Sequence, residues 1–164
     1  MAKLKAKTIV MDGYIKWARL RTSEMDTKFV PDGQYNAEFY PEDQENLDKI
    51  MSEAKERGKK IALKDPYDGE GFGTGKYFKI YRNHVNRSVE EFGGPPVVFK
   101  MGEDYEGIVK RWDFETDGLI GNGSRVRVKL VMYGEGNMAG HRLEKLGVLD
   151  LVSYVPDAGM ASGF

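Results

Sequence analysis

Hydrophobic and polar residues alternate along several short segments of the chain, which is the pattern of half-buried β-strands. Residues 14–22 alternate in this way, and residues 34–40 place Tyr35, Ala37 and Phe39 on one face. Glycine- and proline-rich turns separate these segments from one another. The same pattern predicts further strands at residues 76–85, 96–101, 107–114, 124–133 and 143–155.

The period changes between residues 42 and 57. Leu47, Ile50, Met51 and Ala54 are spaced as i, i+3, i+4 and i+7 in an otherwise charged segment, so this segment is the one predicted α-helix. The glycine-rich residues 64–75 are predicted to form a flexible connection.

The predicted fold class is mainly β. Several strands, one early helix and long loops favour an antiparallel β-barrel of the OB type, with an SH3-like barrel or a small sandwich as the alternatives. The chain has 164 residues, which suits one domain, predicted over residues 1–155 with a short C-terminal tail at 156–164.

The composition narrows the functional classes. There is no cysteine, which excludes disulfides, thiolate zinc sites and a cysteine nucleophile and fits a reducing cytoplasm. Mean hydropathy is -0.55, and no apolar run has the length of a membrane span or the form of a secretory signal. The start at Met1 is expected to be unprocessed. We therefore expect a cytoplasmic protein with no membrane partner.

Charges are segregated although the net charge is only -1. Residues 1–22 contain six basic side chains and one acid, and residues 76–87 contain four basic side chains and no acid. Residues 41–56 and 101–118 each carry six acids and two bases. This distribution is typical of a protein with one face for an anionic ligand, although charges that merely solvate the surface are the simpler explanation.

Cations and aromatic rings share faces on three predicted strands. In residues 124–133 one face is apolar, whereas the other carries Arg125, Arg127 and Lys129. Proteins that bind single strands need cations along the phosphates and rings on which bases stack. The alternative is that the rings pack inside or across strands while the cations face solvent. The other two mixed sets are Tyr77, Lys79 and Tyr81, and Ile15, Trp17, Arg19 and Arg21.

Enzyme and metal motifs are not matched. Residues 69–76 look like a phosphate loop, but Glu70 and Tyr77 occupy positions that need glycine and Ser or Thr. Asp65, Asp68 and Glu70 lack the spacing of an EF-hand loop. His84 and His141 belong to no metal-binding motif, and no serine lies in a nucleophile elbow. We expect no enzyme activity, no cofactor and no metal.

Several segments resemble the single-stranded DNA-binding proteins of T7-like bacteriophages. The specific stretch is residues 119–133, with a glycine turn, Gly-Ser and an alternating basic and apolar strand that ends in Tyr133. Residues 65–69 and 76–81 are similar to the loop and strand that precede it in that family. Residues 33–57 and 143–155 follow the family's order of elements, so the resemblance spans roughly residues 29–155.

The resemblance implies an OB fold and a role in phage DNA replication, recombination and repair in the host cytoplasm. The resemblance also implies that DNA is contacted by Lys79, Tyr133 and Lys3. The chain departs from the family in two features. The family has a second aromatic residue where this chain has Glu135. Members of the family also end in a long acidic tail closed by an aromatic residue. Residues 156–164 end in Phe164 but are nearly free of acid, so recruitment of replication proteins through this tail is in question.

The sequence thus predicts a sequence-independent single-stranded DNA-binding protein, which could form a homodimer. RNA or duplex binding by the same barrel is one alternative, and a protein-interaction module without nucleic acid is another. The residues predicted to stack on bases are Trp17, Tyr77, Tyr81 and Tyr133. The residues predicted to contact phosphates are Lys3, Arg19, Arg21, Lys79, Arg82, Arg125, Arg127 and Lys129.

Overall fold

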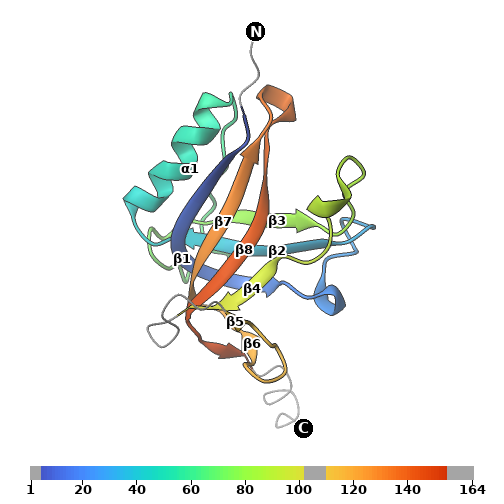
Figure 1. The fold of residues 1–164 in the computed structure, drawn as a ribbon. Helices are drawn as coiled ribbons and strands as arrows, with labels where there is room; N and C mark the ends of the chain where they lie inside the picture. The colour runs from blue at the N-terminus through green and yellow to red at the C-terminus, as the bar shows by residue number, and fades with distance from the viewer. Residues whose placement is uncertain (1–4, 102–109, 155–164) are drawn as a thin grey trace.

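One strongly curled sheet forms most of the molecule (Figure 1). The computed structural model describes residues 5–101 and 110–154. The strand order in the sheet is β3-β2-β1-β7-β8-β4-β5, and a small second sheet pairs β6 with β9. The strands are β1 (Lys7–Arg19), β2 (Gln34–Pro41), β3 (Phe78–Asn83), β4 (Val97–Lys100), β5 (Lys110–Arg111), β6 (Leu119–Ile120), β7 (Ser124–Tyr133), β8 (Gly140–Asp150) and β9 (Ser153–Tyr154).

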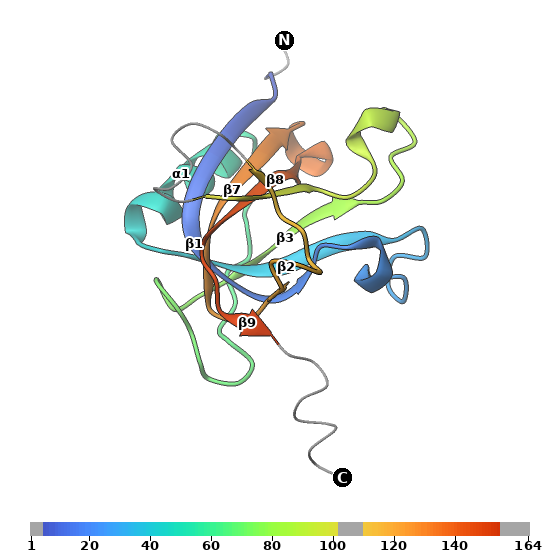
Figure 2. The same cartoon turned by 60° about the horizontal axis from the view of Figure 1, so that its bottom comes forward.

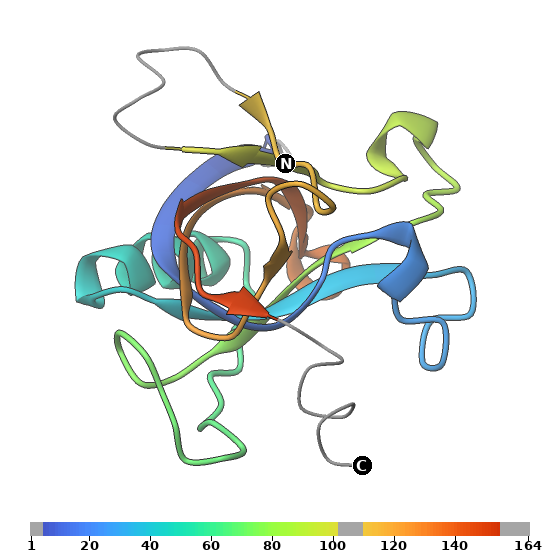
Figure 3. The same cartoon turned by 90° about the horizontal axis from the view of Figure 1, so that it is seen from below.

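The sheet curls until β3 approaches β8, so that Figure 3 shows a nearly closed ring. Side chains link these two strands: the His141 ring lies 3.0 Å from the Lys79 carbonyl oxygen, and Arg82 donates to the Leu143 carbonyl at 3.3 Å. All pairs in the large sheet are antiparallel except β4 with β8. The predicted OB-type barrel is confirmed as an OB-like fold.

The core lies inside this ring and consists of the inward positions of the alternating strands. Met11, Ile15, Phe39 and Leu130 are among the fully buried side chains. Gly13 lies where β1 pairs with the end of β2, and a Cβ there would collide with the Tyr40 carbonyl and the Phe39 ring. Only glycine allows the two strands to approach so closely at this point.

The predicted helix is confirmed as α1 (Gln44–Glu56), which packs outside one wall of the ring (Figure 3). Asp43 caps its first turn by accepting a hydrogen bond from the Asn46 amide at 3.0 Å. Leu47, Ile50 and Ala54 form its buried face. No helix of the described residues is long and apolar enough to cross a membrane.

The strand predictions differ from the structure mainly at their ends. The strand expected at residues 14–22 begins at Lys7, because residues 7–15 pair with β7. The strand expected at 107–114 is reduced, within the described residues, to β5. The long strand expected at 143–155 is divided into β8 and β9.

Candidate nucleic-acid interface

Trp17 has an unusual backbone conformation at the end of β1. Its φ is 53°, the only positive value among the described residues other than glycine, and its side chain is 57% exposed. The register between β1 and β2 shifts between Lys16 and Arg19, which marks a β-bulge. The Trp17 amide donates to the Asn122 side-chain oxygen at 2.8 Å, and this bond fixes the bulge. Conformations of this kind are strained and often occur at functional sites.

A groove begins at Trp17 and runs over the outer face of β2 and β3; we call it the aromatic groove. Its volume is about 460 Å³, and the loop between β1 and β2 borders it on one side. Three aromatic rings line it, those of Trp17, Phe29 and Tyr77. The remaining lining residues are Arg19, Met25, Asp26, Thr27, Lys28, Asn36, Ala37, Glu38, Lys64 and Lys79.

Strand pairing explains why these residues meet. Lys79 lies opposite Glu38 in the β2–β3 register, and Arg19 lies opposite Asn36 in the β1–β2 register. Outward positions on three neighbouring strands therefore form one surface. The structure brings Trp17, Arg19, Tyr77 and Lys79 from the predicted site together in this groove.

Glu38 is one of the two acids in the lining of the aromatic groove; the other is Asp26. Burial raises the pKa of Glu38, and the Lys16 ammonium opposes this rise. Burial, together with Glu38, also raises the pKa of the neighbouring Tyr77. The Tyr77 ring contacts the Tyr40 ring at a centroid distance of 5.3 Å, so it is anchored on the sheet and only partly exposed.

Tyr81 and Tyr133 form a second aromatic group beyond Lys79. The Lys79 ammonium lies 5.9 Å from the Tyr81 ring centroid, and the rings of Tyr81 and His141 are 4.7 Å apart. Burial raises the pKa of Tyr81 and lowers that of His141 to about 4, so this histidine is neutral at pH 7. Tyr133 is 36% exposed. This group lies at the seam between β3 and β8, beside the groove.

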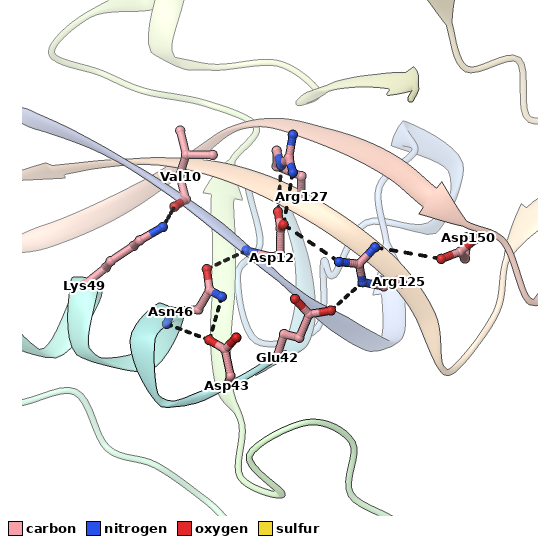
Figure 4. A network of polar contacts seen from close by, with 9 residues as sticks. All are labelled: Val10, Asp12, Glu42, Asp43, Asn46, Lys49, Arg125, Arg127 and Asp150. Carbon is pink, nitrogen blue, oxygen red and sulfur yellow. Dashed lines mark hydrogen bonds and ion pairs between the residues drawn. The ribbon is translucent and has the colours of Figure 1, made fainter. Parts of the chain in front are cut away.

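Arg125 and Arg127, two of the three predicted phosphate contacts on β7, are paired with acids. Arg127 forms two hydrogen bonds with the Asp12 carboxylate, at 2.7 and 3.0 Å. Arg125 donates to Glu42 at 2.5 Å and lies 3.9 Å from Asp150 (Figure 4). The Asp12 carboxylate faces Arg127 because the two residues are directly opposite in the β1–β7 register. This face joins β1, β7 and α1 and lies away from the aromatic groove.

Arg82 is also unsuited to a phosphate contact, because its guanidinium group is buried. It donates to the carbonyls of Gly94 at 2.8 Å, Gly93 at 2.8 Å and Glu91 at 3.1 Å, and it forms an ion pair with Glu144 at 3.3 Å. The residue is 6% exposed. Its donors are used to hold the loop after β3 against β8.

The remaining predicted cations are scattered. Arg21 packs over the Phe114 ring at 5.4 Å in a different cleft, and it forms an ion pair with Glu24. Lys129 lies on β7 opposite Lys145, away from the groove lining. Lys3 lies outside the described residues, as do Phe164 and the rest of the predicted tail.

Nine groove residues were not predicted from the sequence, among them Lys28, Phe29, Asn36 and Lys64. The side chain of Phe29 is 80% exposed, and the Lys28 ammonium lies 5.4 Å from its ring centroid. An aromatic residue next to a lysine, just before the Pro31-Asp32-Gly33 turn, was the available signal. It was missed because only strand residues were sorted by face.

No group of three or more histidine or acidic side chains that could hold a metal ion occurs within the described residues. An apolar and cationic surface of this kind can bind an anionic chain with flat, unsaturated rings.

The fold and groove define an OB-like barrel with an aromatic and cationic binding face. No protein-family model matches the chain, and no curated protein matches its sequence. Among solved structures, the chain is similar to the C-terminally truncated single-stranded DNA-binding protein from bacteriophage Enc34. The TM-score is 0.53 at 11% sequence identity, and the alignment covers 92% of this chain and 88% of that chain. This likeness concerns the fold.

Proposed function

We propose that the protein binds single-stranded DNA, largely independently of sequence, in the aromatic groove. The observation that carries the proposal is the meeting of the Trp17, Phe29 and Tyr77 rings with four cations on one face of the barrel. Base stacking on such rings contributes roughly 1–3 kcal/mol per base and tolerates every base, because each base has a π-face. The cations are Arg19, Lys28, Lys64 and Lys79.

The similarity in fold to a phage single-stranded DNA-binding protein supports the same ligand. Together with the sequence resemblance to the T7-like family, it favours a role in phage DNA replication, recombination and repair in the cytoplasm of an infected bacterium. In this proposal the protein is a binding protein and not an enzyme. Homodimer formation and recruitment of replication proteins through the tail ending in Phe164 belong to the same proposal.

A binding competition tests the ligand class. Fluorescence anisotropy of labelled oligo-dT is measured against unlabelled single-stranded DNA, RNA and duplex DNA. We expect single-stranded DNA to compete best. Preference for RNA or duplex would assign the groove to that ligand, and no binding of any nucleic acid would leave a protein-interaction module as the function.

A pair of lysine variants tests the site. Lys79→Gln removes a groove cation, whereas Lys145→Gln removes an exposed lysine on β8 outside the groove lining. We expect Lys79→Gln to weaken oligo-dT binding by about 1 kcal/mol, and Lys145→Gln to have little effect. Equal effects of the two variants would show that binding is not localised to the groove.

A further inference from the structure

A second cleft lies next to the aromatic groove and shares Trp17 and Arg19 with it; we call it the side cleft. Its other lining residues are Ala18, Glu24, Ile120, Gly121 and Asn122. Its volume is about 370 Å³, within the range of roughly 300–1,000 Å³ that is usual for small-molecule sites. Ile120 of the lining belongs to β6, which pairs with β9, and Figure 2 shows β9 at one end of the barrel.

Trp17 separates the two clefts. The bulge removes this residue from the regular in-and-out alternation of β1, and the bond from its amide to Asn122 holds it there. Trp17 lines both clefts and is 57% exposed. An indole placed between two adjacent cavities can stack with one flat ligand on each side.

The walls of the side cleft are held in place where β6 pairs with β9. The Gly121 amide donates to the Val152 carbonyl at 2.7 Å, and the Ser124 hydroxyl donates to the Gly121 carbonyl at 2.8 Å. The buried Ile120 forms the apolar part of the lining. These bonds fix the backbone of the wall that contains Ile120 and Gly121.

The chemistry of the lining favours a neutral ring with a polar edge. The Glu24 carboxylate accepts from the Leu20 amide at 3.2 Å and would repel a phosphate group. The side-chain oxygen of Asn122 accepts from Trp17, and its amide group is a donor for a carbonyl on a ligand. Nucleobases have this combination of an aromatic face and carbonyl groups on the edge.

We propose that the side cleft binds one unstacked nucleobase of the DNA strand whose neighbouring nucleotides occupy the aromatic groove. This inference rests on the proposed function. The Trp17 indole separates this base from the next one and stacks with both. The strand consequently turns at Trp17 from the outer face of β2 and β3 toward the end of the barrel, with Arg19 beside both bases.

Photo-cross-linking tests this path with the full chain. Oligo-dT that contains 4-thiothymidine at successive single positions is bound and irradiated, and the cross-linked tryptic peptides are sequenced by mass spectrometry. We expect one position to cross-link within residues 120–122 of the peptide 112–125, and neighbouring positions to cross-link to the groove peptides 22–28 and 29–49. Cross-links to the groove peptides alone overturn the inference and leave the proposed function intact, whereas absence of binding overturns both.

Asn122→Asp provides a second measurement. Aspartate keeps the acceptor for the Trp17 amide, so the fold of the bulge is retained, but it places a second carboxylate in the side cleft. We expect affinity for oligo-dT to fall about fivefold and the cross-link within residues 120–122 to disappear while the groove cross-links persist.

The control variant is Gln44→Glu, which makes the same change of charge at an exposed position on α1. If Asn122→Asp binds oligo-dT as tightly as Gln44→Glu and retains the cross-link within residues 120–122, the side cleft does not hold a base. If the variant does not fold, the wild-type cross-linking still decides between the two paths.

Discussion

At the scale of single residues, Trp17 shows what strand parity can and cannot predict. Strand parity groups Trp17 with Ile15, which is buried, so the exposure of Trp17 results from the bulge and not from alternation along β1. The bulge and the positive φ depend on Asn122, more than a hundred residues away, and no local pattern indicates them. The same bulge gives Trp17 access to two clefts.

Trp17→Gly separates binding from stability. Glycine adopts a positive φ without strain, so we expect the free energy of unfolding to stay the same or to rise by up to about 1 kcal/mol. Loss of the indole should weaken oligo-dT binding by roughly 1–3 kcal/mol. Urea denaturation and fluorescence anisotropy measure the two effects. A clear loss of stability would mean that the indole is a packing residue.

Arg82 and Lys79 lie on the same strand and differ in role because they differ in parity. Arg82 shares its face with Phe78 and Ile80, which are buried, whereas Lys79 alternates with them. Parity therefore contained the signal that Arg82 points inward. The predicted phosphate contact at Arg82 did not follow this parity, and arginine can be buried where carbonyls accept its hydrogen bonds.

Arg82→Met should lower the free energy of unfolding by about 2–4 kcal/mol, because the carbonyls of residues 91, 93 and 94 and the Glu144 carboxylate lose their donor. The control is Arg87→Met, whose side chain is 83% exposed, and we expect it to change stability by about 0.5 kcal/mol or less. Urea denaturation provides the measurement. Unchanged stability of Arg82→Met with weakened DNA binding would restore the phosphate role.

At the scale of elements, α1 was predictable and the contacts of β7 were not. The helix is specified by its own apolar spacing and by Asp43 at its start, both of which are local. The basic face of β7 could be predicted from the sequence, but the acidic residues that lie beside it in the fold could not. The register places Asp12 opposite Arg127, and α1 begins next to Glu42, so acids from two distant segments meet this face.

The network in Figure 4 joins β1, β7 and the start of α1, and its stabilising effect should depend on pH. The hydrogen bond from Arg127 holds the pKa of Asp12 below its ordinary value of 3.8. Because the folded-state pKa is the lower one, ionised Asp12 stabilises the fold above the unfolded-state pKa. This stabilisation is lost as the pH falls through the folded-state pKa.

Asp12→Asn should therefore be destabilised relative to the wild type by about 1 kcal/mol near neutral pH, with a difference that shrinks below about pH 4. The backbone N–H of residue 12 still donates to the Asn46 side-chain oxygen in the variant, so the attachment of α1 is not otherwise changed. Denaturant unfolding of both proteins across this pH range measures the difference. A constant difference would show that the Asp12 charge does not contribute.

At the scale of the whole molecule, the cations are of two kinds, which the near-zero net charge does not distinguish. Arg125 and Arg127 on β7 are paired with Asp12 of β1, Asp150 of β8 and Glu42, which follows β2, and these pairs contribute to the structure. The cations in the aromatic groove are spread over β1, the β1–β2 loop, the segment after α1 and β3. Composition alone could not separate the two kinds, because the separation is made by strand pairing and by where the loops lie.

The salt dependence of DNA binding distinguishes these two kinds of cation. Each phosphate neutralised on a single strand contributes about 0.7 to the slope of log affinity against log salt concentration. The four groove cations therefore predict a slope of about -3, whereas all eight cations predicted from the sequence would give about -6. Lys79→Gln should reduce the magnitude of the slope by about 0.7.

Arg127→Gln should leave the salt slope unchanged, since the Arg127 guanidinium is already paired with Asp12. A steeper wild-type slope that Arg127→Gln reduces would mean that the strand also contacts β7 and that Asp12 releases its partner when DNA binds.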